Sequence, residues 1–187
     1  MVVAAVLLGI ALVIVFAALL SFNRFVRQQQ LVDNSWSNVD TELKRRYDLI
    51  PNLVATVKGY AAHESETLEA VVRARRVALD EQGGAADQAV QENVLVDALQ
   101  QLLALREAYP DLKANVQFLD LQQQLTATED RIQAARRFYN ANVRDYNTRV
   151  ETFPSMLVAS LGRFEKRDYF EVEPAIRDAG APGVALT

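Results

Sequence analysis

Few residues of this chain have the types and spacing that support catalysis. It contains one histidine, His63, and no cysteine, whereas a zinc site needs several imidazole or thiolate ligands that converge. His63-Glu64 matches half of a metalloprotease motif, but Thr67 stands where the second histidine would fall. Gly83-Gly84 lacks the lysine and the preceding strand of a phosphate-binding loop. The sequence therefore predicts no enzyme activity, no metal and no cofactor, and His63 is interpreted as a polar helix-start or interface residue.

Three consecutive cations, Lys44-Arg45-Arg46, form a dense local charge. An unbroken helix from Arg24 would carry them about 30 Å beyond the membrane surface, several screening lengths from lipid phosphates. Internal pairing or a protein partner is therefore favoured over lipid binding. Arg46 also falls in an otherwise apolar seam, where two alternatives stay open. Its guanidinium reaches solvent beside Glu42, or it forms a buried ion pair with a carboxylate of another helix.

Several asparagines lie in segments that otherwise favour helix, although asparagine is a poor helix former. Its side chain carries donors and an acceptor, which suits hydrogen bonds across a bundle or to a partner. Bonds inside one subunit, together with nearby tyrosines, are the simpler alternative. The asparagines are Asn52, Asn115, Asn140, Asn142 and Asn147.

The elements that position these residues begin with an apolar run. Residues 2–22 contain no charged side chain, and as a helix they span about 30 Å, the thickness of the hydrocarbon core of a bilayer. No basic residue precedes the run and no small-residue cleavage pattern follows it, so an uncleaved membrane anchor is favoured over a secretory signal. Arg24 and Arg27 follow the span, and the positive-inside tendency places the bundle in the cytoplasm and the N-terminus outside.

The rest of the chain predicts an all-α fold, in which a four-helix antiparallel bundle over residues 23–173 follows the transmembrane helix. Glycine and proline, at 7 and 5 residues, are too sparse for a β-sandwich. Apolar residues follow a four-three repeat from Val32 to Val57, with a kink or a restart expected near Pro51. The expected further segments are helices over 64–79, 86–108, 111–151 and 155–162, a strap over 164–172 and a mobile tail over 174–187.

Several long runs of sequence strongly resemble the LemA family, and the similarity covers about residues 21 to 173. The runs are KRRYDLIPNLV (44–54), GYAAHE (59–64), AYPDLKAN (108–115), ARRFYN (135–140) and VRDYN (143–147), with Tyr169-Phe170 adding to the match. The resemblance implies a bacterial membrane protein with one N-terminal span and an antiparallel helical bundle. The family has no established catalytic activity, so the resemblance implies architecture more than mechanism. The candidate interaction or structural residues are Arg45, Arg46, Asn52, His63, Asn115, Arg137, Asn140 and Asn147.

The functional expectation is a non-enzymatic, membrane-anchored scaffold or adaptor in the bacterial inner membrane. Its expected partners are lipid, through residues 2–22, and a protein. Ala5 and Gly9 have the small-xxx-small spacing that favours self-association of membrane helices. The alternative is a regulatory or substrate-presenting subunit of a membrane-bound protease. The net charge of −4 argues against a nucleic-acid partner.

Overall fold

The computed structural model describes residues 1–172. The predicted tail over 174–187, and the last residue of the predicted bundle range, lie outside the described residues. All regular elements of the described part are helices, which confirms the all-α prediction. In chain order they are α1 (Val2–Lys58), α2 (Ser65–Asp80), α3 (Ala85–Ala104), the 3₁₀ helix η1 (Leu105–Glu107), α4 (Pro110–Lys113), α5 (Val116–Glu151) and α6 (Ser155–Gly162).

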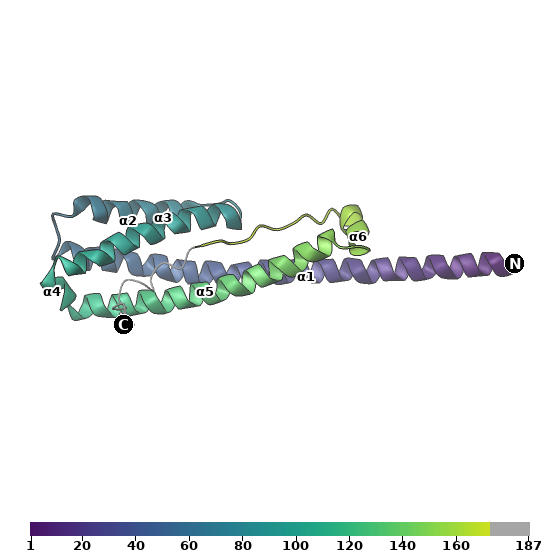
Figure 1. Cartoon of the computed structure of the whole chain (residues 1–187), viewed down its shortest axis with the longest axis horizontal. Helices are drawn as coiled ribbons and strands as arrows, with labels where there is room; N and C mark the ends of the chain where they lie inside the picture. Colours follow the sequence, from purple (N-terminus) through teal and green to yellow (C-terminus); the bar gives the residue numbers. More distant parts are fainter. Residues whose placement is uncertain (173–187) are drawn as a thin grey trace, which may run out of the picture.

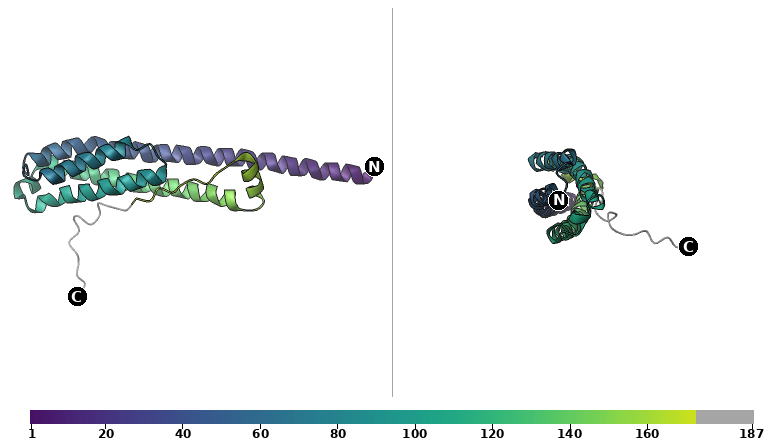
Figure 2. Two further views of the ribbon diagram at one scale, coloured as in Figure 1. Left: turned by 90° about the horizontal axis from the view of Figure 1, so that it is seen from above. Right: turned by 90° about the vertical axis from the view of Figure 1, so that its left-hand side faces the viewer.

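Successive long helices run in opposite directions, and α1, α2, α3 and α5 lie side by side at the end of the molecule far from the N-terminus (Figures 1 and 2). The helices differ greatly in length, with 57 residues in α1 and 36 in α5 but only 16 in α2 and 20 in α3. Four helices therefore surround the core only in the far half of the bundle. Nearer the N-terminus, the α1–α5 pair is covered by α6 and the strap, residues 164–172.

Helix α1 joins the membrane span to the core without interruption. The side chains from Met1 to Leu20 are exposed and project beyond the bundle (Figure 1), whereas Phe25 is fully buried. From there the predicted four-three seam faces the core, because Val32, Val39 and the seam residues beyond them are buried. Among the described residues, α1 is the one helix long and apolar enough to cross a bilayer. The protein is therefore membrane-anchored by its N-terminal helix.

Helix α1 continues through Pro51, so the predicted restart of the helix does not occur. Proline has no N–H, so the carbonyl oxygen of Tyr47, one turn earlier, loses its helical donor. The Nε–H of Arg75 on α2 donates to this oxygen at 2.7 Å. Arg75 thereby supplies the missing hydrogen bond and ties α2 to α1.

The start of α5 also differs from the prediction of one helix over 111–151. Pro110 opens only the single turn of α4, and α5 begins at Val116. The side chain of Asn115 accepts a hydrogen bond from the backbone N–H of Phe118 at 2.8 Å, so it caps α5. The preceding helix is also shorter than predicted, because α3 ends at Ala104 and continues as η1.

Candidate functional site

The centre of the bundle holds a buried ionic network around Arg46. Its guanidinium donates to Glu92 of α3 and, at 3.0 Å, to Glu129 of α5, and all three side chains are almost wholly buried. Of the two alternatives that the sequence leaves open, the structure therefore shows the buried ion pair with other helices. The guanidinium does not reach solvent beside Glu42. Because the three residues lie on three helices, their geometry fixes the relative positions of α1, α3 and α5.

Neutral donors complete this network, because two carboxylates face one guanidinium. Tyr47 donates its hydroxyl to Glu92, and Gln88 donates to the same carboxylate at 2.8 Å. Gln133 donates to Glu129 at 2.6 Å. Burial, followed by the nearby Glu92 carboxylate, raises the pKa of Tyr47 above its ordinary value of 10.0. The phenol therefore stays protonated and acts as a donor.

The sequence carried a signal for this network that the interpretation of Arg46 alone missed. Extending the spacing of Leu95, Leu99 and Leu102 backwards in steps of three and four reaches Glu92 and Gln88. Each of these polar residues therefore occupies a core position of α3. Charged residues at core positions of different helices are expected to pair, because an isolated buried charge is strongly unfavourable.

A second network holds the strap against α5 through two asparagines. Asn147 accepts from the N–H and donates to the carbonyl of Arg167, both at 2.8 Å. Asn140 makes the same pair of bonds with Phe170, at 2.9 and 3.0 Å. Seven residues of helix and three residues of extended chain both cover about 10 Å, so the two spacings match. Asn140 and Asn147 bind only backbone groups of the strap. They therefore favour an extended conformation of the strap and do not discriminate among its side chains.

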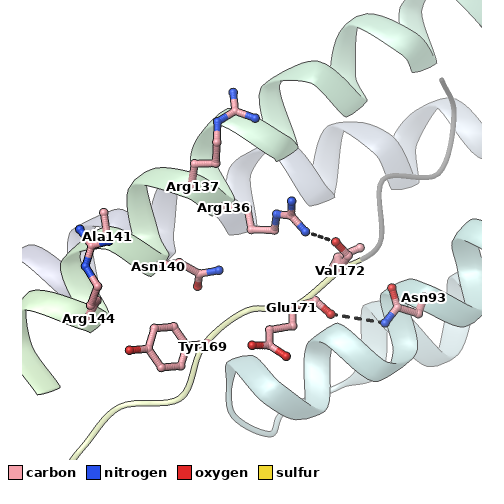
Figure 3. Close-up of a pocket in the computed structure, with 9 residues that line it drawn as sticks. All are labelled: Asn93, Arg136, Arg137, Asn140, Ala141, Arg144, Tyr169, Glu171 and Val172. Atoms are coloured by element: carbon pink, nitrogen blue, oxygen red, sulfur yellow. Dashed lines mark hydrogen bonds between the residues drawn. The ribbon is translucent and has the colours of Figure 1, made fainter.

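Further donors continue this contact along the strap. Arg136 donates to the carbonyl of Val172, and Asn93 of α3 donates to that of Glu171 at 3.4 Å (Figure 3). Tyr139 donates to the carbonyl of Asp168 at 2.9 Å, and burial raises the pKa of Tyr139 to about 12. The strap is thus bound from both α3 and α5.

Aromatic side chains anchor the strap at both of its ends. Phe170 is fully buried, with its ring centroid 5.3 Å from that of Trp36. Phe164 stacks on Phe25 at 4.8 Å and contacts Phe22 edge-on at 5.3 Å. These contacts join the strap to α1 as well as to α5, so the strap closes the part of the bundle that α2 and α3 leave uncovered.

A hollow of about 690 Å³ lies between α5 and the strap, but its cations do not converge. Figure 3 shows that Arg136 points towards Val172 whereas Arg137 points away from the strap. Arg137 is exposed, and Arg144 lies 3.6 Å from Asp145. Among residues 1–172, no group of three or more histidine or acidic side chains is placed to hold a metal ion.

The remaining predicted residues lie apart from both networks. Arg45 is exposed and lies 3.5 Å from Glu42, and Asn52 is exposed on α1. His63 is exposed in the connection between α1 and α2. The amide nitrogen of Asn115 donates to the Tyr60 hydroxyl at 2.8 Å, which ties the start of α5 to the end of α1. The structure therefore gathers Asn140 and Asn147 into one network, Arg46 into another, and leaves the others separate.

A groove of about 680 Å³ lies on the outside of the bundle between the end of α1 and α2. Val72 and Val77 are 52% and 45% exposed, although both are apolar. Three cations and one acid line the groove with them: Lys58, Arg73, Arg76 and Glu69.

Sequence comparison identifies the family of the chain. The sequence profile of the LemA family matches residues 35–185, which is most of the chain and includes both networks. The chain belongs to the LemA family. As a LemA-family member it has the architecture that its sequence predicts, a membrane helix that continues into a helical bundle.

The relatives of this LemA-family chain include a LemA protein and magnetosome proteins. It is 28% identical to "Protein LemA" of Metamycoplasma hominis, over 80% of this chain and 66% of the relative. It is 25% identical to "Magnetosome protein MamQ 2" of Paramagnetospirillum magneticum, over 92% of this chain and 73% of the relative. It is also 25% identical to "Magnetosome protein MamQ" of Magnetospirillum gryphiswaldense, over 84% of this chain and 67% of the relative. The chain thus spans about two thirds to three quarters of these proteins.

Proposed function

We propose that the protein is a non-enzymatic scaffold or adaptor that recruits a protein partner to a bacterial membrane. The observation that carries this proposal is the α1–α2 groove, an apolar floor with a charged rim on the outside of a bundle. The polar side chains at the centre of the bundle bind one another, and Asn140 and Asn147 of α5 bind the strap. The groove is thus a surface that combines exposed apolar residues with unburied charge, the composition of a protein interface.

The charges of the rim indicate the partner's chemistry. Lys58, Arg73 and Arg76 outnumber Glu69, so an acidic amphipathic segment fits the groove best. Apolar side chains of such a segment would cover Val72 and Val77, and its carboxylates would meet the arginines. The rim charges would raise the association rate and the specificity, while the floor supplies most of the affinity.

Photocrosslinking in native membranes tests the adaptor proposal. A photoreactive residue at Val72 should capture one protein in stoichiometric amounts, whereas the same residue at Val90, 59% exposed on α3, should not. Charge reversal by Arg73→Glu with Arg76→Glu should abolish the adduct. Arg144→Glu, at an exposed position of α5, is the matched control and should leave the adduct unchanged. Equal adducts at Val72 and Val90, or an adduct that survives the double reversal, would refute the groove as the recruiting surface. An adduct of twice the chain mass would identify the partner as a second copy.

A second candidate function is regulation of a membrane-bound protease or presentation of substrates to it. The contact that favours this candidate is the asparagine pair of α5, because it holds a peptide extended through backbone groups alone. Extended segments are also what edge strands and clefts of other proteins bind. The identity of the crosslinked partner separates the candidates: a single protease subunit supports regulation, and a non-protease partner supports an adaptor.

We also infer that the protein resides in the inner membrane with the bundle in the cytoplasm. Arg24 and Arg27 follow the span, and positively charged flanks favour the cytoplasmic side. Protease added outside right-side-out vesicles should leave the bundle intact. Digestion of the bundle under these conditions would show the opposite orientation.

A further inference from the structure

Helix α6 lies where the bundle meets the C-terminal end of the membrane span. Gly162, its last residue, packs so closely on α1 that an added Cβ would come within 3.2 Å of the Phe22 ring. Phe22 ends the uncharged run that spans the bilayer, so α6 lies level with the bilayer surface. Figures 1 and 2 show α6 lying across the direction of α1 at the end of the bundle nearest to the N-terminus. A helix across a membrane-normal helix lies parallel to the membrane plane.

One side of α6 is buried, and the other exposes large apolar side chains. Ala159 is 2% exposed and faces the bundle. In contrast, Phe153, Leu157 and Leu161 are 73%, 56% and 87% exposed. Leu157 and Leu161, four residues apart on α6, lie in one row, and Phe153 precedes the helix at the α5–α6 corner. A contiguous apolar row of this kind marks an interaction surface.

The charges around α6 indicate what covers this row. Arg24 and Arg27 on α1 and Arg163 after α6 form no ion pair with a carboxylate among residues 1–172. Lys166, three residues further along the strap, already pairs with Glu151 at 2.7 Å. Cations that flank an apolar row at the end of a membrane span match the headgroup region of a bilayer with anionic lipids.

We propose that α6 is an interfacial membrane helix, which inserts Phe153, Leu157 and Leu161 between lipid headgroups beside the span. The occupant of the apolar row is the bilayer to which α1 already anchors the chain. The bundle would then contact the membrane at two places, which holds α1 upright and fixes the rotation of the bundle about it. This proposal rests on the membrane anchor and is independent of the partner groove.

The absence of native cysteine permits a direct test with the full chain, because one introduced cysteine gives one labelling site. Leu161→Cys, Leu12→Cys and Val90→Cys are labelled with an environment-sensitive fluorophore and reconstituted in vesicles of phosphatidylcholine and phosphatidylglycerol. The fluorescence emission of the label at Leu161 should shift to shorter wavelength. This emission should also be quenched more by a nitroxide near the lipid headgroup than by one near the bilayer centre. The label at Leu12 should show the reverse preference, and the label at Val90 should show neither effect.

The outcomes separate the anchor from the interfacial helix. Quenching at Leu12 without quenching at Leu161 would refute the interfacial helix and keep the anchor. A blue shift at Leu161 without lipid quenching would show that protein covers α6 and would also refute it. Loss of quenching at Leu12 would refute both. Leu157→Asp, at a largely exposed position, should reduce headgroup quenching at Leu161 while leaving the helix content of the chain unchanged; a change in quenching at Leu12 as well would contradict a local role.

Discussion

The two polar networks of the bundle use different chemistry to hold different parts of the chain. The Arg46 network joins charged side chains of three helices and is almost wholly buried. The strap network joins neutral asparagine side chains to backbone groups and is only partly buried. Removing one ion from the Arg46 network leaves the remaining ions unpaired in a low-dielectric interior. Backbone groups released from the strap network can instead form hydrogen bonds with water. The first network should therefore control the whole fold, and the second only the strap.

The largest effect is expected from breaking the Arg46 network. Arg46→Ala should lower the free energy of unfolding by about 3–5 kcal/mol, because Glu92 and Glu129 stay buried without a cation. Arg45→Ala, at an exposed neighbouring position, should change the free energy by less than about 0.5 kcal/mol. Chemical unfolding of the reconstituted chain, followed by circular dichroism, measures both. Equal effects of the two variants would contradict a network that governs the fold.

Replacing the whole network sharpens the same comparison. Arg46→Met with Glu92→Leu and Glu129→Leu removes the charges together, so no ion is left unpaired. Such replacements are often neutral or stabilising by about 1–4 kcal/mol. The triple variant should therefore be more stable than Arg46→Ala in the same unfolding measurement. A triple variant that is less stable than the single one would show that the network contributes net stability.

The strap network should give a smaller and local effect. Asn140→Ala with Asn147→Ala removes four hydrogen bonds, each of which contributes about 0.5–1.5 kcal/mol. Trypsin should then cleave after Arg167 several-fold faster, while the unfolding of the helices changes little. Asn52→Ala, at an exposed position of α1, is the matched control and should not change cleavage. Unchanged cleavage in the double variant would show that the asparagines do not hold the strap.

The bond from Arg75 to the Tyr47 carbonyl is expected to contribute about 1.5–3 kcal/mol, the range for hydrogen bonds to charged groups. Arg75→Met should lower stability by this amount in the natural sequence. In a Pro51→Ala background the restored N–H can bond the same carbonyl, so Arg75→Met should have a smaller effect. A double-mutant cycle of thermal unfolding measures the difference. Additive effects would mean that Arg75 does not compensate for the proline.

The smallest effect is the alkaline response of the strap. The pKa of Tyr139 is raised from 10.0 to about 12 by burial, so the folded state favours the protonated phenol. Its contribution to stability is complete below pH 10 and is lost as the pH rises from 10 to about 12. Strap cleavage should accelerate over this window, and Tyr139→Phe should remove that acceleration. Acceleration that persists in Tyr139→Phe would assign it to another group.

The sequence predicts the helices better than the contacts between them, for physical reasons. The four-three seam from Val32 to Val57 is visible because burial repeats with the helix period. The sequence does not reveal the capping role of Asn115, because the residues on both sides of it favour helix and no break in the pattern marks the start of α5. The binding of the strap by Asn140 and Asn147 leaves no sequence pattern on the strap, since only backbone groups are recognised. The α1–α2 groove arises from packing and has no local sequence signature.

The central claim is that the polar residues of the bundle form two independent networks, one for the helices and one for the strap. Amide hydrogen exchange of the full chain in bilayers tests it most directly. The amides of Arg167 and Phe170 should be protected, and Asn140→Ala should release Phe170 without affecting the buried part of α1. Arg46→Ala should instead accelerate exchange throughout the bundle. Strap amides that exchange freely in the natural chain, or uniform acceleration in Asn140→Ala, would contradict the claim.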